Sequence, residues 1–194
     1  MADQKISAMP SAATLTGAEL VPLVQSGANV KATLDVLRGY DSNYGAFSDN
    51  TDQTGSVSAG TAMLFGSTDV ADGVTLSAGT RLVVPKTGVY NVQFSAQLKN
   101  TDNAQQDATI WFRINGVDVP NSATQITVPA RKSAGIFGYA VAAWNIMLQM
   151  NASQYVEIIW VPTSTTVTVE ALPASLSPAY PAIPSVIATV SQVG

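Results

Sequence analysis

Residues 85–98 carry the clearest alternation of apolar and polar side chains in the chain. The run PKTGVYNVQFSAQL opens with Pro85 and Gly88, which punctuate its start. Every second position after them is apolar, namely Tyr90, Val92, Phe94, Ala96 and Leu98. A period of two places these side chains on one face of a β-strand and the intervening polar ones on the other. The pattern predicts a central strand of a sandwich of sheets, with one face in the core.

Further short apolar runs predict strands throughout residues 57–194. We expect them near residues 57–65, 80–85, 109–115, 117–119, 135–144, 146–150, 155–160, 167–171 and 186–190. Asn115 and Gly116 form a strong signal for a two-residue hairpin turn between two of these strands. A proline-rich stretch from Pro173 to Pro184, which contains Tyr180, predicts a stiff and exposed loop. Together these patterns predict an all-β head domain.

Four segments of this head resemble the trimeric jelly rolls of complement heads and tumour necrosis factors, which also occur at the tips of bacteriophage fibres. They are Pro85 with Gly88, Tyr90, Phe94 and Ala96; FRINGVDV at 112–119; LQMNASQYVEI at 148–158; and the closing strand at 185–193. The resemblance covers roughly residues 57–194. Ser153 and Gln154 stand where the family usually has Gly-Asp, so no function that depends on that acid is carried over. The resemblance implies a jelly-roll fold and a threefold assembly, without a particular ligand.

Two strands of the predicted head carry candidates for a trimer interface. Trp111 and Arg113 lie on the face opposite to the core side chains of their strand, and we favour a subunit contact for Trp111 over packing beneath a loop. The run GIFGYAVAAW at 135–144 is apolar on both faces, which is typical of a strand buried on both. Such a strand is expected near the threefold axis, or else beneath a loop. The interface candidates are therefore Trp111, Tyr139, Val141 and Trp144.

Residues 1–40 differ from the head and predict an extended N-terminal arm. An apolar run with an internal proline is followed by a turn at Ser26–Asn29 and a second short run. Thr33 is a candidate cap for one helical turn that Gly39 ends. A segment of this length cannot bury its own apolar side chains. We therefore expect it to dock onto a partner. The residues expected to make that contact are Leu20, Val21, Leu23, Val24, Leu34 and Leu37.

This arm resembles the short N-terminal anchor of many phage tail-fibre and other virion proteins. The match lies in residues 5–10, 15–25 and 30–37 and follows the pattern "isalp…ltgaelvpvvq…kvtl". The resemblance implies attachment to a virus particle. Residues 41–56, rich in Gly, Ser, Asn and Asp, predict a linker between the arm and the head at 57–194. Asp49 and Asp52 in that stretch are interpreted as solvated linker acids rather than calcium ligands.

Composition narrows the chemistry that this chain supports. Only 11% of its residues are charged, against 46% hydrophobic ones, which favours outer faces buried by partner subunits. A net charge of −4 with scattered basic residues argues against nucleic-acid binding. The lack of Cys and His removes thiol catalysis, the usual triad base and the usual zinc ligands. We expect a soluble chain without an export signal, a membrane span or a cofactor, although a calcium ion on the trimer axis stays open.

The two resemblances, together with this composition, imply a non-enzymatic bacteriophage structural protein at the virion surface, assembled in the host cytoplasm. A compact head on a short anchor favours a trimeric capsid head fibre or decoration protein that binds capsid or tail proteins. The alternative is a tail fibre or receptor-binding protein that recognises host glycans. Aromatic side chains that stack on sugars are Trp111, Trp144, Trp160 and Tyr180, but the first three lie within predicted strands.

An enzyme is the less favoured class of function. Asp102 with Asp107, and Asp69 with Asp72, are the nearest approach to the paired carboxylates of a glycosidase. Acids in such turns usually accept hydrogen bonds from nearby backbone amides, so we do not expect catalysis.

Overall fold

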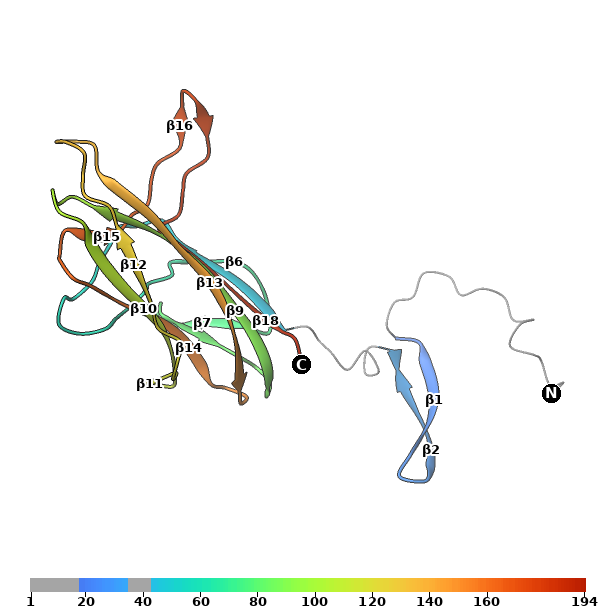
Figure 1. Cartoon of the computed structure of the whole chain (residues 1–194). Helices are drawn as coiled ribbons and strands as arrows, with labels where there is room; N and C mark the ends of the chain where they lie inside the picture. Colours follow the sequence, from blue (N-terminus) through green and yellow to red (C-terminus); the bar gives the residue numbers. More distant parts are fainter. Residues whose placement is uncertain (1–17, 35–42) are drawn as a thin grey trace. The chain divides into compact units, whose positions relative to one another are not determined.

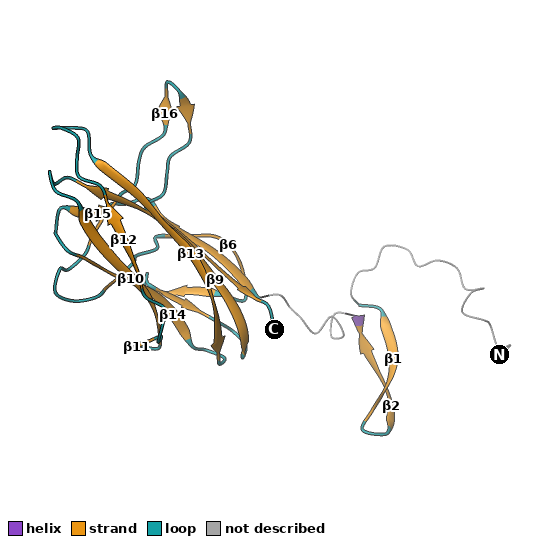
Figure 2. Cartoon of the chain, in the orientation of Figure 1, coloured by secondary structure: helices purple, strands orange, loops and turns teal. Residues whose placement is uncertain are grey.

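The computed structural model describes residues 18–34 and 43–194. The chain divides into two units, residues 1–41 and 42–194, and each is described by itself. Strands dominate the described part of both units (Figure 2), which confirms the all-β prediction. No helix within these two ranges has the length and apolar character that a membrane crossing requires.

One sheet of the head is organised around β9, the strand predicted from the alternation at residues 85–98. β9 pairs with β13 along one side, and with β18 and β15 along the other. The predicted strands at 135–144 and 146–150 form the single continuous strand β13, which lies beside β9 (Figure 1). In spatial order the sheet contains β13 (Gly138–Met150), β9 (Gly88–Asn100), β18 (Val186–Gln192), β3 (Tyr44–Asp49) and β6 (Ser67–Asp72), and β15 (Val167–Val169) and β4 (Gln53–Thr54) extend it beside β9.

The second sheet is organised around β10 and β14, which pair over seven residues. The predicted turn between residues 114 and 117 is present, with positive φ at Asn115 (48°) and Gly116 (81°). In spatial order this sheet contains β12 (Thr124–Val128), β10 (Gln106–Ile114), β14 (Tyr155–Pro162), β8 (Arg81–Val83) and β7 (Thr75–Ser77), and β11 (Val117–Asp118) and β5 (Thr61–Ala62) add to β10 and β14.

The two sheets enclose one hydrophobic core. The ring centroids of Phe94 on β9 and Phe112 on β10 lie 5.8 Å apart in an edge-to-face arrangement, so the two rings join the sheets. The apolar positions predicted for the buried face of β9 are all in this core: Tyr90, Val92, Phe94, Ala96 and Leu98. The register of the organising strand is therefore confirmed.

The predicted linker at residues 41–56 is wrong in its described part, residues 43–56, because this stretch belongs to the head. β3 pairs with β18 on one side and with β6 on the other, and Phe47 is completely buried. β4 pairs with β15, and a Cβ at Gly55 would lie 2.9 Å from the Trp160 ring. The head therefore begins before residue 57.

Replacing Phe94 with alanine is expected to lower the free energy of unfolding by about 3–5 kcal/mol. The side chain is 5% exposed and also packs against Trp144, with ring centroids 4.5 Å apart, so truncation leaves a cavity in the middle of the core. Denaturant unfolding at a fixed protein concentration measures the change. Gln93→Ala, on the opposite face of the same strand, is the control and should change stability by less than about 0.5 kcal/mol. Equal stability of the two variants would contradict the packing described here.

Candidate interaction surfaces

The outer face of the sheet built on β9 presents a broad surface with few charged side chains. The pairing registers align outward side chains of β13, β9, β18 and β3 into continuous rows. Val141, Met147 and Ile187 are 56%, 56% and 39% exposed, which is unusual for large aliphatic side chains. Across these four strands three rows contain no charged residue, whereas on the next strand, β6, Asp72 lies opposite Tyr44. The rows are Ala143, Ser95, Ile187 and Ser48; Asn145, Gln93, Thr189 and Ala46; Met147, Asn91, Ser191 and Tyr44.

β13 forms the edge of this sheet. Among the described strands its backbone ladder is made with β9 alone. Its thirteen residues, GYAVAAWNIMLQM, include neither a charge nor a proline, the two devices that commonly protect an edge strand from pairing with another chain. The edge and the adjoining face are therefore suited to contact with another protein surface.

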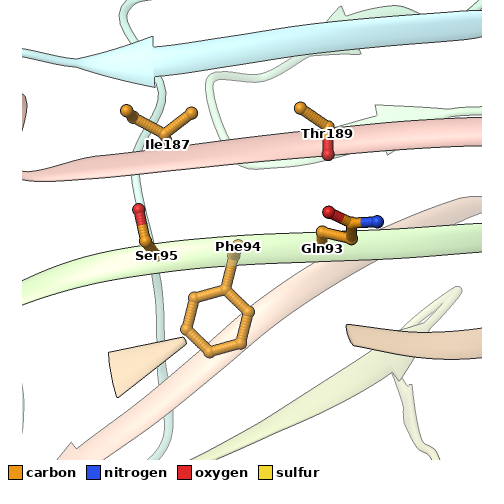
Figure 3. Close-up of a pocket in the computed structure, with 5 residues that line it drawn as sticks. All are labelled: Gln93, Phe94, Ser95, Ile187 and Thr189. Carbon is orange, nitrogen blue, oxygen red and sulfur yellow. The ribbon is translucent and has the colours of Figure 1, made fainter. Parts of the chain in front are cut away.

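Two shallow hollows lie on this face, on either side of Gln93. One, of about 210 Å³, lies between β9 and β18 and is lined by Gln93, Phe94, Ser95, Ile187 and Thr189 (Figure 3). Figure 3 shows the Phe94 ring pointing away from the other four side chains, towards the core. The other, of about 310 Å³, lies between β9 and β13. Neither hollow is lined by an ionisable group, so both suit packing rather than catalysis.

Charged groups at one end of this face neutralise each other. Lys99 forms an ion pair with the buried Glu170, and this hydrogen bond raises the pKa of Lys99. The Lys99 ammonium also lies 4.6 Å from the centre of the Phe137 ring. Partial burial, together with the nearby Glu170 carboxylate, raises the pKa of Tyr139. This end of the face therefore adds little net charge to the surface.

The structure places the four trimer-interface candidates in different environments. Tyr139 and Val141 are 50% and 56% exposed on the outer face of β13. Trp144 lies on the opposite face of the same strand, where its ring packs edge-to-face against Phe94 and Phe112. Within one chain the outer side chains of this strand are open, so no loop covers them, and their burial near a threefold axis stays a prediction.

Trp111 lies beneath a loop, which is the alternative to a subunit contact that the sequence left open. A Cβ at Gly60 would come within 2.7 Å of the indole ring, so the loop backbone covers it closely. The indole Nε1 donates a hydrogen bond of 2.7 Å to Asp118 Oδ1, and Arg113 Nε donates another of 2.7 Å to the same oxygen. The hydrogen bond from Arg113, and to a smaller extent the one from Trp111, hold the pKa of Asp118 below its usual range. This arrangement accounts for Trp111 without a subunit contact.

The aromatic side chains proposed for sugar stacking are mostly enclosed. Trp160 is fully buried, and Trp111 and Trp144 are half-buried in the contacts described above. Tyr180 is 43% exposed on a projecting hairpin of β16 (Ser175–Leu176) and β17 (Ala179–Tyr180). Of the four, only Tyr180 offers an open ring.

Three of the four carboxylates considered for catalysis, Asp102, Asp107 and Asp69, are tied into local hydrogen bonds. Asp107 accepts hydrogen bonds from Gln125 and Thr127, and Asp102 accepts them from Gln106 and the Ala104 amide. Asp69 accepts hydrogen bonds from Ser48 and Ser67. Over residues 18–34 and 43–194, no group of three or more acidic side chains is placed to hold a metal ion.

The described part of the N-terminal unit is a two-stranded hairpin. β1 (Leu20–Gln25) pairs with β2 (Ala28–Thr33) across a turn in which Ser26 and Gly27 both have positive φ, 52° and 78°. Val21 and Leu23 lie opposite Ala32 and Val30 on one face. The other face is mixed: Leu20 and Val24, which are 57% and 67% exposed, lie there opposite Thr33 and Asn29.

This hairpin carries most of the predicted anchor residues. Leu34 adopts a helical conformation directly after β2, and its amide donates a hydrogen bond of 2.8 Å to the Glu19 carbonyl. Leu37 lies outside the described residues. A lone two-stranded hairpin is marginally stable in water, so apolar side chains on both faces indicate a surface that docks onto a partner.

Comparisons with known proteins add nothing on function, so any functional inference depends on the surfaces described above. No protein-family model matches the chain, and no curated protein matches its sequence at a significant level.

Proposed function

We propose that this chain is a non-enzymatic structural protein of a bacteriophage particle, a trimeric head fibre or decoration protein attached through its N-terminal arm. The observation that carries the proposal is the hairpin of β1 and β2, in a unit separate from the head, with apolar side chains on both faces and Leu20 and Val24 exposed on one of them. A partner surface that covers both faces is the simplest source of its stability. The location proposed is the virion surface, after assembly in the host cytoplasm.

The strand order of the head supports a jelly-roll fold. Eight of its strands, taken in chain order, are β3, β8, β9, β10, β12, β13, β14 and β18. The first, eighth, third and sixth form neighbours in one sheet, and the second, seventh, fourth and fifth in the other. This interleaving of early and late strands in two sheets is the order of a double Greek key. It agrees with the fold implied by the resemblance to complement heads and tumour necrosis factors.

The uncharged outer face and the open edge of β13 support a threefold assembly of the head. The exposed Val141, Met147 and Ile187 on a largely uncharged face favour burial by a partner, and a second copy of the same chain presents the same neutral chemistry. Of the four residues predicted for the trimer interface, Tyr139 and Val141 lie on this outer face. Met147 and Ile187 are exposed on the same face.

Immunogold labelling of purified particles tests the proposed function. Antibody against the chain should label the surface of intact capsids at a regular copy number. Label confined to the tail would favour the alternative, a tail fibre or receptor-binding protein. Absence of the chain from purified particles would refute both.

Sedimentation of the whole chain tests the assembly. The expected mass is three times 20.1 kDa, about 60 kDa, because three subunits close the uncharged faces. Val141→Asp should shift the distribution to monomer, since it places one carboxylate per subunit in the contact. Val117→Asp is the control, because Val117 is 71% exposed on β11 of the other sheet and should leave the trimer intact. A monomeric parent protein would refute the assembly.

A further inference from the structure

The head has two poles, and the chain enters at one of them. β3 begins at Tyr44, opposite Ser191 near the C-terminus, and ends at Asp49, opposite Val186. The loop after Asp49 and the hairpin of β16 and β17 therefore lie at the end of this sheet away from the entry point. Figure 1 shows the hairpin projecting beyond the strands at that end. We call this end the distal pole.

A hollow of about 270 Å³ lies at the distal pole, between the loop after β3 and the base of the hairpin. The base is fixed by two backbone hydrogen bonds between Leu172 and Ile183, of 2.9 and 2.8 Å. Asp52 Oδ1 accepts a hydrogen bond of 2.9 Å from the Ala171 amide, which ties the opposite wall to it. The walls are Asn50, Asp52, Ala171, Leu172, Pro173 and Ala182. Two segments that lie more than a hundred residues apart in the sequence thus form the walls of one depression, and hydrogen bonds hold these walls together.

The lining of this hollow combines an apolar floor with two polar groups. Leu172, Pro173 and Ala182 supply the apolar surface. In the described part of the structure, no hydrogen bond occupies the second carboxylate oxygen of Asp52 or the Asn50 amide. A carboxylate and an amide together accept from and donate to hydroxyl groups.

The charge of the lining restricts the class of ligand. No basic side chain lines the hollow, and the nearby Lys99 is already paired with Glu170. An anionic ligand would face the Asp52 carboxylate without compensation. The volume is slightly below the range of ordinary ligand pockets, about 300–1,000 Å³, which suits one ring rather than a large molecule.

We infer that the hollow at the distal pole binds one residue of a neutral carbohydrate. Its C–H surface packs on Leu172 and Pro173, while its hydroxyls bind Asp52 and Asn50. The biological role, recognition of a cell-surface glycan, rests on the proposed attachment of the protein to a particle through the arm.

Glycan binding by the whole protein tests this inference. The probe is an array of neutral gluco-, galacto- and manno-configured oligosaccharides beside sialylated and sulfated ones, followed by calorimetric titration with the best neutral oligosaccharide. Binding to at least one neutral oligosaccharide is expected. No neutral binding, or binding confined to charged glycans, would overturn the inference.

Matched variants locate the binding. Ala182→Leu fills the hollow and should weaken binding at least about tenfold. Asp52→Asn keeps an acceptor for the Ala171 amide but removes the charged partner of a sugar hydroxyl, and should weaken it about tenfold. Ala179→Leu, on the exposed β17 outside the hollow, should bind as the parent does. Equal affinity of Ala182→Leu and the parent, or equal losses in Ala182→Leu and Ala179→Leu, would overturn the site.

The two proposals fail separately. Immunogold labelling of particles that carry Ala182→Leu should match the parent, because the arm alone is proposed to attach the protein. Loss of glycan binding with normal labelling supports the site. Absent labelling of the parent protein refutes the attachment but leaves the binding measurement valid.

Discussion

A chain that begins at residue 57 should fail to fold, whereas a chain that begins at residue 43 should fold. Removal of residues 43–56 deletes β3 and β4, and with β3 the backbone partners of six residues of β18. It also removes the fully buried Phe47 from the core, a loss of about 3–5 kcal/mol even as a single truncation to alanine. Domains of this size are stable by only about 5–15 kcal/mol. The combined loss of side-chain packing and strand pairing therefore exceeds the free energy of unfolding of the domain.

Far-UV circular dichroism and thermal melting of the two chains measure this difference. The chain from residue 43 should show a β-rich spectrum and one cooperative transition. The chain from residue 57 should be insoluble or lack a transition. Phe47→Ala in the longer chain is an intermediate test and should lower the melting temperature without abolishing the fold. A cooperative transition in the chain from residue 57 would show that β3 is dispensable.

β9 could be predicted from the sequence because its buried face is uninterrupted. Five apolar side chains alternate with polar ones, and no inward position breaks the period. β3 could not be predicted in the same way, since its buried positions include Gly45, Phe47 and Asp49. Only one of these three is a large apolar side chain. Hydropathy alone therefore cannot distinguish β3 from a polar linker.

Hydrogen bonding explains how so polar a segment is buried. Asp49 accepts a hydrogen bond from the Thr51 amide at 2.7 Å, and its carbonyl accepts one from the Ser185 amide. Gln53 donates to the Leu64 carbonyl and accepts from the Leu64 amide. Buried polar groups with partners cost little, whereas unpaired ones are expensive. Of these partners, Leu64 and Ser185 lie outside the segment, so no local pattern in the sequence reports them.

The candidate surfaces were predictable to different degrees. Strand periodicity alone separates Trp144 from Tyr139 and Val141, because positions of opposite parity point to opposite faces. An interface that includes all three requires partners on both faces of the strand, and the rings of Phe94 and Phe112 already pack against the face that carries Trp144. The distal hollow required residues 50–52 and 171–182 to meet, and no periodic signal reports such a contact. The hairpin of β1 and β2 was visible as two apolar runs about a turn.

Removal of residues 1–40 should abolish incorporation of the protein into particles while the head still folds and forms trimers. The hairpin of β1 and β2 belongs to a unit separate from the head, so its loss removes none of the strand pairs of the two head sheets. It carries apolar side chains on both faces, and Leu20 and Val24 are more than half exposed. An added strand at a partner's sheet edge, with these side chains in adjoining pockets, is the docking mode that we propose.

A single charge on the hairpin should have a smaller effect in the same direction. Val24→Asp should lower the copy number per particle, since it places a carboxylate in an apolar contact. Val117→Asp, at a similarly exposed valine of the head, should leave it unchanged. Attachment should depend weakly on salt, because Lys5, Lys31 and Arg38 balance Asp3, Glu19 and Asp35 in this segment. Quantitative mass spectrometry of purified particles gives the copy number. Normal incorporation of the chain that lacks residues 1–40 would place the attachment surface on the head instead.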